Sequence, residues 1–470
     1  MIKNHIINEL KNKFTYTPTA SQLELIEKLS FFITNPIDNS IFLIKGYAGT
    51  GKTSLIAALV KVLTDMKMKS ILLAPTGRAA KVLSAYVGSS AYTIHKKIYK
   101  QKSIADANSA FSLDRNMSSD TLFIVDEASM IANTSLDQSM FGSGRLLDDL
   151  ITYVKGGKRC KLIIIGDNAQ LPPVGLSISP ALDKHELLSY ADCIDVTLNE
   201  VVRQAADSGI LYNATAVRNQ IERQDIHLPH ILHTQFADIK TINGSDLMEE
   251  LSDAYSRYGS EEVMVICRSN RRANKYNEGI RSRILFRDEE IAQGDRIMVV
   301  KNNYQSLKGN EEMDFIANGD TAHIKRIRKY EERYGIRYVN VSLLFDDYNN
   351  MEIDSKIMLD TLSIETASLP TERNKELFFA INEDYAHITQ KRKRYSAIRE
   401  DAYFNALQVK FAYAITCHKA QGGQWRCVFL DNPFFKENTI SLEDLRWMYT
   451  AITRATEKLY LVNFDEKMLM

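Results

Sequence analysis

The sequence of 470 residues has few cysteines and no excess of charge of either sign. Five cysteines are scattered along the chain without C-x-x-C spacing, which argues against a zinc site and against a disulfide framework. The 59 lysine and arginine residues balance 59 aspartate and glutamate residues, so the formal net charge is zero. A globally basic surface is therefore excluded, and any site for a polyanion must be a local groove.

Long hydrophobic runs are also absent. The apolar runs at 41–44 and 162–165 are far shorter than the roughly 20 residues of a membrane-spanning helix. The first residues contain no apolar region typical of a secretory signal, and the scarcity of cysteine suits a reducing compartment. We therefore expect a cytoplasmic location. At roughly 100–200 residues per domain, the length predicts two to four domains.

Between about 41 and 200 the chain alternates short apolar runs with helix-like segments. The runs are IFLIKG (41–46), ILLAPT (71–76), LFIVDE (122–127) and LIIIGD (162–167). They are continuously apolar, which is typical of strands that are buried on both faces of a parallel sheet. The segment 54–66 has apolar residues at helical spacing and supplies a helix between two of these strands.

The same pattern returns later in the chain. VMVICRSN (263–270) is typical of a strand followed by a turn, and the next stretch to Ile284 of a helix. Further buried strands are expected at 411–416, 427–431 and 459–464. Between them, 294–304, 317–327 and 338–345 are typical of short strands joined by polar turns, and about 355–405 is charged and helix-like. We therefore predict two α/β lobes, with an insertion at 305–405 in the second.

A complete G-x-x-x-x-G-K-[ST] motif, GYAGTGKT, spans 46–53 between the first strand and a helix. Its glycines let backbone amides surround phosphates, and the helix amino terminus adds positive potential. Lys52 is predicted to reach the β- and γ-phosphates, and Thr53 to ligate Mg²⁺. The motif therefore predicts a nucleotide site, and the lack of an NKxD motif favours ATP over GTP.

Polar residues follow two further strands. Asp126 is predicted to hold Mg²⁺ through its water shell, and Glu127 to accept a proton from the attacking water. Asp167 and Gln170, in GDNAQLPPV (166–174), are predicted to overlook the γ-phosphate. The alternative for this segment is a rigid turn that merely closes a strand.

Taken together, these motifs resemble superfamily-1 helicases, in particular the RecD-like and phage Dda-like group that moves 5′→3′ along single-stranded DNA. APTGRAA and QLPPV favour this group over the 3′→5′ branch. The segments that follow the order of the family's motifs are GYAGTGKT (46–53), APTGRAAKVL (74–83), TIH (93–95), VDEAS (125–129), GDNAQLPPV (166–174), LNEVVRQ (198–204), ITCHKAQGGQW (415–425) and MYTAITRATEKLYLV (448–462).

The resemblance implies an α/β fold with two RecA-like P-loop lobes. It also implies a small hairpin insertion in the first lobe, and an SH3-like barrel with a helical extension in the second. The predicted limits are 1–97 and 121–195 for the first lobe, 98–120 for the hairpin, 196–304 and 406–470 for the second lobe, and 305–405 for the barrel and helical extension.

The resemblance assigns a role to each matched position. Gln22, in TPTASQLELI, would contact the adenine, and Gln170 would couple the γ-phosphate state to lobe movement. Arg203 and Arg454 would reach across the cleft as arginine fingers, with surface salt bridges as the alternative. The predicted catalytic residues are Lys52, Glu127, Gln170, Arg203 and Arg454. The predicted ATP-binding residues are Gln22, Gly46, Ala48, Gly49, Thr50, Gly51, Lys52, Thr53, Ser54, Asp126, Arg203, Gly423 and Arg454, with Thr53 and Asp126 also as Mg²⁺ ligands.

Single-stranded DNA binding requires phosphate donors along a groove and flat side chains for base stacking. Hydroxyls and backbone amides grip phosphates without adding charge, which reconciles DNA binding with a neutral chain. The predicted DNA-binding residues are Pro75, Thr76, Arg78, Thr93, His95, Phe111, Arg268, Asn270, Thr416, His418 and Lys419. Arg271 and Lys275 would join Arg268 at the second lobe's entrance, unless they form a solvated helix face. His95 and His418 lack a histidine or acidic partner at i+3 or i+4, so no metal is expected there.

Three features leave alternatives open. The hairpin at 98–120 would be a pin that splits the duplex, with Phe111 either stacked on the last base pair or anchoring the hairpin as an apolar contact. The basic run KRKR (391–394) either touches DNA or forms a solvated helix. Gln424 stands where the family often has an acidic residue, so a ribose-linked or Mg²⁺-linked role is not carried over to it.

We therefore expect an ATP- and Mg²⁺-dependent DNA helicase that moves 5′→3′ and unwinds duplex DNA. A translocase that displaces bound proteins without efficient unwinding would have much the same sequence. A P-loop phosphotransferase for a small molecule would need neither arginines on a second lobe nor a DNA groove. The residues do not distinguish DNA from RNA as the track. Both halves of the ATP site lie on one chain, so a monomer suffices, and we expect no membrane and no obligate protein partner.

Overall fold

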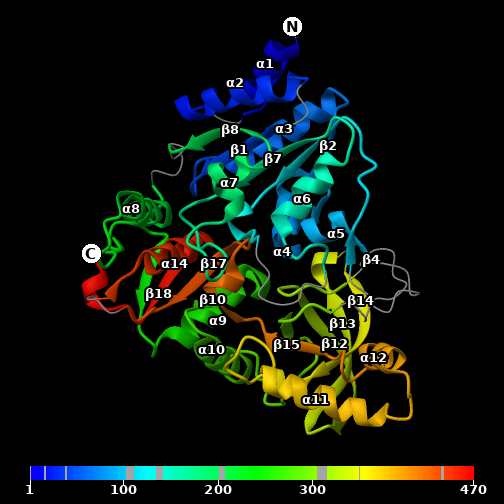
Figure 1. Ribbon diagram of the computed structural model, residues 1–470. Coiled ribbons are helices and arrows are strands. Elements are labelled where there is room, and N and C mark those ends of the chain that lie inside the picture. The colour runs from blue at the N-terminus through cyan, green and yellow to red at the C-terminus, as the bar shows by residue number, and fades with distance from the viewer. Residues whose placement is uncertain are drawn as a thin grey trace.

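The computed structural model describes residues 2–14, 17–36, 40–101, 111–133, 141–200, 207–303, 315–348, 350–435 and 439–470. In Figure 1, lobe 1 lies at the top, lobe 2 at the lower left, and a barrel with two helices at the lower right. The predicted fold class is confirmed: two RecA-like α/β lobes are joined by a small barrel with a helical extension. None of the helices in the described ranges is long and apolar enough to cross a membrane.

Lobe 1 contains a parallel sheet with the strand order β3-β2-β6-β7-β1-β8. Its strands are β1 (Ser40–Gly46), β2 (Lys69–Ala74), β3 (Ala91–Thr93), β6 (Thr121–Val125), β7 (Lys161–Gly166) and β8 (Asp192–Leu198). Its helices are α1 (Ile2–Lys13), α2 (Ala20–Thr34), α3 (Lys52–Asp65), α4 (Gly77–Val87), α5 (Ile94–Ile98), α6 (Leu146–Lys155) and α7 (Lys184–Leu188), with short 3₁₀ helices at Ala128–Met130 and Pro180–Leu182. A two-stranded hairpin is added by β4 (Tyr99–Gln101) and β5 (Phe111–Leu113).

Both faces of the lobe 1 sheet are covered, which explains its continuously apolar strands. Along β1, Phe42 and Ile44 face the layer of α1, α2 and α3, whereas Ile41 and Leu43 face the layer of α5, α6 and α7. Each strand therefore needs an apolar side chain at every position, because successive side chains point to opposite faces.

Lobe 2 repeats this plan with a parallel sheet in the order β16-β10-β17-β18-β9. Its strands are β9 (Ile239–Ile242), β10 (Val263–Cys267), β16 (Ala414–Thr416), β17 (Trp425–Asp431) and β18 (Ala455–Val462). Its helices are α8 (Gly209–Arg223), α9 (Leu247–Tyr258), α10 (Asn270–Arg283), α13 (Cys417–Ala420) and α14 (Leu442–Ile452), with 3₁₀ helices at Ser260–Glu262 and Glu466–Met468. Helices α8 and α14 pack on one face of the sheet, and α9 and α10 pack on the other.

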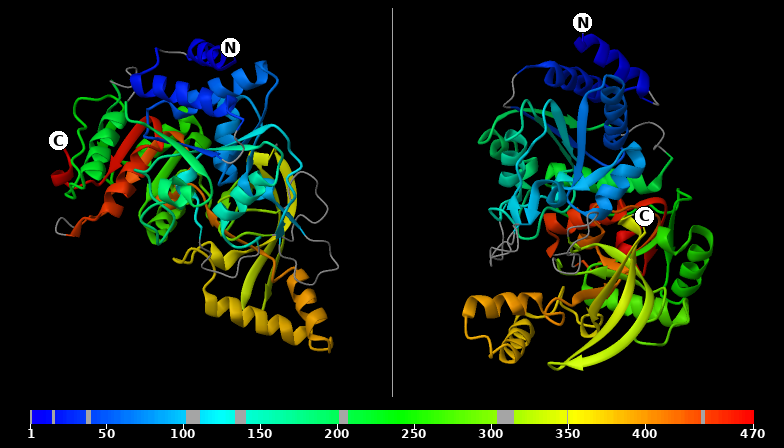
Figure 2. Two further views of the ribbon diagram at one scale, coloured as in Figure 1. Left: turned by 45° about the horizontal axis from the view of Figure 1, so that its top comes forward. Right: turned by 90° about the vertical axis from the view of Figure 1, so that its right-hand side faces the viewer.

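The barrel is closed by five strands, and two helices extend from it as an arm (Figure 2). The strands are β11 (Arg296–Val299), β12 (Thr321–Arg333), β13 (Ile336–Phe345), β14 (Met351–Met358) and β15 (Leu407–Phe411), with 3₁₀ helices at Asp346–Tyr348 and Leu359–Thr361. The arm consists of α11 (Thr371–Asp384) and α12 (Lys391–Glu400). The helix-like reading of 355–405 is wrong at its start, because β14 extends to Met358. The predicted domain limits stay predictions, although β11 and β15 lie outside 305–405.

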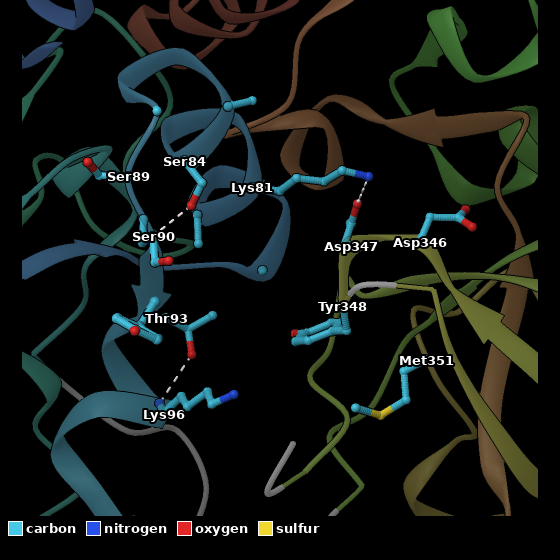
Figure 3. Close-up of a pocket in the computed structure, with 16 residues that line it drawn as sticks. Lys81, Ser84, Ser89, Ser90, Thr93, Lys96, Asp346, Asp347, Tyr348 and Met351 are labelled. Carbon is cyan, nitrogen blue, oxygen red and sulfur yellow. Dashed lines mark hydrogen bonds and ion pairs between the residues drawn. The ribbon is translucent and has the colours of Figure 1, made fainter. Parts of the chain in front are cut away.

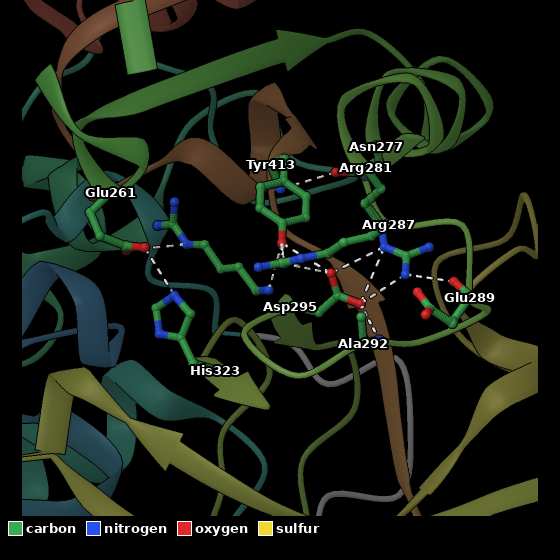
Figure 4. Close-up of polar contacts among 10 residues, drawn as sticks. Glu261, Asn277, Arg281, Arg287, Glu289, Ala292, Asp295, His323 and Tyr413 are labelled. Carbon is green, nitrogen blue, oxygen red and sulfur yellow. Dashed lines mark hydrogen bonds and ion pairs between the residues drawn. The ribbon is translucent and has the colours of Figure 1, made fainter. Parts of the chain in front are cut away.

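A buried ion-pair cluster joins the barrel to lobe 2 (Figure 4). Asp295, which directly precedes β11, is fully buried and pairs with Arg281 of α10 at 3.0 Å and with Arg287 at 2.9 Å. The hydroxyl of Tyr413 donates to the same carboxylate at 3.2 Å, and the amide of Ala292 donates at 2.7 Å. A buried carboxylate is stable only when it is fully paired, so this cluster fixes the barrel on lobe 2.

Replacing Asp295 with alanine is expected to destabilise the protein by about 3–5 kcal/mol, because the buried guanidinium group of Arg281 and the half-buried one of Arg287 lose their partner. Urea unfolding followed by the fluorescence of Trp425 and Trp447, both in lobe 2, measures this change. Glu457→Ala is the matched control, since Glu457 pairs with Arg426 at 2.7 Å on the exposed surface. Equal urea midpoints for the two variants would contradict the role given to Asp295.

Candidate nucleotide and nucleic-acid site

The loops that follow the lobe 1 strands gather at one edge of the sheet, because parallel strands end on the same side. The P-loop follows β1, Asp126 follows β6, and Asp167 follows β7. The strands β6, β7 and β1 are consecutive neighbours in the sheet. This edge faces lobe 2, so residues of both lobes surround the site.

The P-loop has the backbone conformation that its glycines allow. Gly49 and Gly51 have φ values of 74° and 81°, in the left-handed region that disfavours residues with a Cβ. Lys52 begins α3, and its ammonium group donates to the carbonyl of Gly46 at 2.6 Å and to that of Tyr47 at 2.8 Å. Thr53 and Ser54 follow in the first turn of α3, where their hydroxyls lie at the helix amino terminus.

Asp126 and Glu127 form the acidic pair expected from the sequence. Burial raises the pKa of Asp126 to about 7, and the neighbouring Glu127 carboxylate adds to this rise. Glu127 has a φ of 54°, a left-handed conformation that non-glycine residues rarely adopt and that is common at functional sites. The oxygens of Asp126 and Thr53 are the ligand type that Mg²⁺ prefers, so these residues fit the metal.

Asp167 and Gln170 lie beside the P-loop. Asp167 is 1% exposed and lies 3.9 Å from the Lys52 ammonium group. The side-chain oxygen of Gln170 is buried and has no hydrogen-bond partner in the described part of the chain. A buried acceptor without a partner is costly, so this oxygen fits a donor that arrives with the substrate, such as a water molecule at the γ-phosphate.

Gln22 lies against the P-loop backbone. Its side-chain nitrogen donates to the carbonyl of Thr50 at 3.0 Å, and its oxygen accepts from the amide of Thr19 at 2.9 Å as part of the capping box of α2. Both ends of its amide are therefore occupied. This geometry matches a brace that holds the P-loop, and the adenine contact expected from the sequence stays a prediction.

On lobe 2, Arg454 is turned into its own lobe. It is 2% exposed and donates to the carbonyls of Thr450 and Gly423, each at 3.0 Å. As a finger toward the phosphates, it must leave these partners. Arg203, the second predicted finger, lies outside the described residues.

Three lobe 2 residues that contact lobe 1 were not found from the sequence. Tyr449 bonds to both Ala48 and Asp167, Thr450 accepts from the Leu171 amide at 2.9 Å, and Gln421 donates to the Leu171 carbonyl at 2.6 Å. The available signal was their position within the segments that carry Arg454 and His418. Tyr449, Thr450 and Gln421 carry no charge, so they stand out less in these segments than Arg454 and Lys419.

A cavity of about 260 Å³ lies where lobe 1, lobe 2 and the barrel meet. It brings together four of the predicted DNA-binding residues, Thr76, Arg78, His418 and Lys419, with Asn318 of the barrel. Arg78 is half-buried, and its guanidinium group lies 4.2 Å from the Trp425 ring of lobe 2. Burial lowers the pKa of Arg78 to about 10. Pro75 precedes Thr76 between β2 and α4, and Thr416 precedes α13.

A second cavity, of about 690 Å³, lies between α4 of lobe 1 and the barrel (Figure 3). Thr93, Lys96 and Lys81 line its lobe 1 side, and Asp347 lines the barrel side. Lys81 pairs with Asp347 at 2.8 Å. The hydroxyl of Thr93 accepts a hydrogen bond from the Lys96 amide as the amino-terminal cap of α5. One of its acceptor positions is therefore already occupied within the fold.

Two predicted DNA-binding residues are instead part of a buried aromatic cluster. Phe111 is 3% exposed, and its ring centroid lies 4.8 Å from that of Phe141 and 5.9 Å from that of Phe315. His95 lies 4.9 Å from Phe141, and burial lowers its pKa to about 4. The contacts of Phe111 match the apolar-anchor alternative, because a ring enclosed in this way has no free face for a base.

Other predicted positions have local partners. Arg268 pairs with Asp444 at the start of α14, and its guanidinium group lies 4.9 Å from the Phe435 ring. Arg271 lies 3.3 Å from Glu365 on the surface. Asn270 is the first residue of α10.

Comparisons with known proteins agree with this arrangement of two lobes. A model of the AAA domain family matches residues 32–229, and a model of the UvrD-like helicase C-terminal domain family matches residues 411–462. The ATP-dependent DNA helicase Dda of Enterobacteria phage T4 is 26% identical over 439 residues, covering 89% of this chain and 93% of Dda.

An uncharacterized protein of Methanocaldococcus jannaschii, MJ1519, is 25% identical over 481 residues and 92% of this chain. The chain spans only 37% of the length of that relative. Among solved structures, one of two coordinating Pif1 helicases at forked double-stranded DNA is 16% identical, with a TM-score of 0.48 and coverage of 96% of this chain and 94% of that chain.

Gln22→Ala is expected to weaken nucleotide binding, because the buried Thr50 carbonyl of the P-loop loses its donor, at a cost of about 1–3 kcal/mol. Titration with fluorescent ATP and GTP analogues measures the effect. Thr19→Ala is the matched control, since it removes the cap of α2 and leaves the contact with Thr50. Equal losses for ATP and GTP indicate a brace, and a loss for ATP alone indicates an adenine contact. An effect no larger than that of Thr19→Ala would contradict the brace.

Proposed function

Because the chain is a superfamily-1B helicase of the RecD- and Dda-like group, an ATP-hydrolysing DNA helicase, we propose that it moves 5′→3′ on single-stranded DNA and unwinds duplex DNA. ATP is hydrolysed in the cleft between the two lobes. The resulting change in lobe contacts moves the protein along the strand.

One observation carries this proposal: a single segment runs from the nucleotide site to the cavity where the three parts of the protein meet. Asp167 lies beside Lys52, Leu171 bonds to Thr450 and Gln421 of lobe 2, and 172–174 line the cavity. A change at the phosphates therefore has a continuous path of hydrogen bonds and backbone to the cavity. Such a shared element lets one ligand bias the other site.

The geometry of the nucleotide site supports a role for each of its residues. The P-loop amides and Lys52 bind the phosphates, Gln170 positions the attacking water, and Glu127 accepts its proton. Thr53 and Asp126 would hold Mg²⁺, which would supply positive charge beside the phosphate oxygens. Arg454 completes the site only after it leaves the carbonyls of its own lobe, which ties hydrolysis to a movement of lobe 2.

The positions of the residues also support the DNA roles. Thr76 is the amino-terminal cap of α4, and this helix end offers backbone amides and positive potential to a phosphate. Arg78 and Lys419 line the same cavity and supply charge locally on a chain of zero net charge. His418 lines it as a polar group, because burial lowers its pKa and favours the neutral ring. Thr93 and Lys96, in the second cavity, extend the track along lobe 1.

A second candidate function is a single-strand translocase that displaces bound proteins without efficient unwinding. The observation in its favour is the burial of Phe111, which leaves the hairpin without that ring as a stacking face. Residues 102–110 of the hairpin lie outside the described ranges.

Strand displacement on two duplexes, one with a 5′ tail and one with a 3′ tail, tests the proposal. With ATP and Mg²⁺, only the 5′-tailed substrate is expected to be unwound. Lys52→Ala is the control, since it removes the phosphate-binding ammonium group and is expected to abolish turnover while leaving DNA binding largely intact. Unwinding of the 3′-tailed substrate alone would show that the protein moves 3′→5′ and would contradict the proposed direction. ATPase stimulated by single strands without unwinding of either substrate would support the translocase.

DNA affinity is expected to fall between pH 7 and pH 9 through Lys419. Burial lowers the pKa of Lys419 to about 8, and a bound phosphate stabilises the charged form, so the contact is present at low pH and lost as the pH rises through the bound-state pKa. Fluorescence anisotropy with a labelled oligo(dA) strand should show a loss of roughly fivefold to tenfold. Lys419→Arg stays charged at pH 9, and an equal loss in this variant would exclude Lys419 as the cause.

A further inference from the structure

Tyr449 of lobe 2 occupies the lobe 1 nucleotide site with its hydroxyl. The residue lies in α14 and is 1% exposed. Its oxygen accepts from the amide of Ala48 at 2.7 Å and donates to the carboxylate of Asp167 at 2.7 Å. Burial and the Asp167 charge raise the pKa of Tyr449 well above its usual value, so the group stays a neutral donor.

The amide of Ala48 belongs to the P-loop, whose backbone amides serve to cradle phosphates. In this structure the Ala48 amide is satisfied by a phenol, and the Lys52 ammonium group is satisfied by the carbonyls of Gly46 and Tyr47. Lobe 2 thus supplies an acceptor oxygen where a phosphate oxygen would otherwise be the acceptor. One amide hydrogen cannot serve both oxygens at full strength.

We propose that Tyr449 is the positioning residue by which lobe 2 senses phosphate in the P-loop. Its hydroxyl holds Ala48 and Asp167 when the P-loop is empty, and a bound nucleotide phosphate displaces it. The displacement itself is inferred from the two hydrogen bonds of Tyr449 alone. Its consequence for movement of the lobes rests on the proposed function.

The position of Tyr449 on α14 explains how its release would spread. The next residue, Thr450, holds the amide of Leu171, whose neighbours line the cavity between the lobes. Arg454, just beyond the end of the helix, is held by carbonyls of lobe 2. Releasing Tyr449 therefore frees the same end of α14 that must move for Arg454 to reach the phosphates. A single movement of α14 therefore both responds to bound phosphate and carries Arg454 toward the nucleotide site.

Tyr449→Phe tests the inference, because it keeps the ring in its buried position and removes both hydrogen bonds. Titration of a fluorescent ADP analogue, in the absence of DNA, is expected to show binding about twofold to tenfold tighter than in the wild type, the range for one competing neutral hydrogen bond. A residue with a purely structural role would leave the affinity unchanged or weaken it. Either of these results would overturn the inference.

Thr450→Val is the matched control on the same helix. It removes the bond to Leu171 between the lobes and leaves Ala48 bonded to Tyr449. Its affinity for ADP is expected to stay close to that of the wild type. Equal tightening in both variants would show that any loosening of the lobes has this effect, and would overturn the specific role of Tyr449.

A measurement on the wild-type protein tests the inference even if the Tyr449→Phe variant does not fold. Hydrogen–deuterium exchange of peptides covering 445–452 is expected to rise when ADP is added, because α14 loses its bonds to the P-loop and to Asp167. Unchanged exchange in this segment would also overturn the inference. Neither binding nor exchange requires DNA, so failure here leaves the strand-displacement result standing, and the reverse also holds.

Discussion

Parallel strand direction is the constraint on which this molecule depends. All six strands of the lobe 1 sheet run the same way, so the loops after β1, β6 and β7 meet at one edge. The lobe 2 sheet is built in the same way, and the segment after β16 carries His418 and Lys419 to the cavity shared with lobe 1. Residues that are more than 300 positions apart thus lie within one cleft, because each of them follows a strand.

The sequence predicts those parts of the site that depend on local backbone geometry. The P-loop, Asp126 and Asp167 follow apolar strands, and parallel strands bring their ends together. Side-chain direction is a different matter. Phe111 is buried beside Phe141 and Phe315, which are distant in the sequence, and Arg454 is bonded within lobe 2. Such contacts form only after the helices and strands pack together, so no local sequence pattern predicts them. The first residues of the span 355–405 differ from the prediction for the same reason. Their charged residues suit a helix, but they belong to β14, which is stabilised by its pairing with β13.

The contacts between the parts of the protein differ in kind, and this difference sets which parts can move. The barrel is fixed on lobe 2 by the buried Asp295 cluster, whose separation would expose unpaired charges. The lobes meet through single hydrogen bonds, such as those of Tyr449 and Thr450, and through the packing of Leu171 into the apolar core of lobe 2. Each such bond contributes only about 0.5–1.5 kcal/mol, which is within the range that a bound ligand can supply. The ion-pair cluster therefore holds the barrel on lobe 2 more firmly than any one of these hydrogen bonds holds lobe 2 on lobe 1.

The ion pair between Lys81 and Asp347 has a topological consequence. Lobe 1 touches lobe 2, lobe 2 holds the barrel, and this pair returns the barrel to lobe 1, so the three parts form a closed ring around the cavity that they share. A polymer lying in that cavity is linked through the ring. It can be released only at an end or by opening a joint. Lys81 is 49% exposed, and exposed ion pairs are weak and screened by salt, whereas Phe315, which precedes β12, packs in the buried aromatic cluster of lobe 1, so salt weakens only one of these two contacts between the barrel and lobe 1. Linear and circular strands would then differ in how they enter.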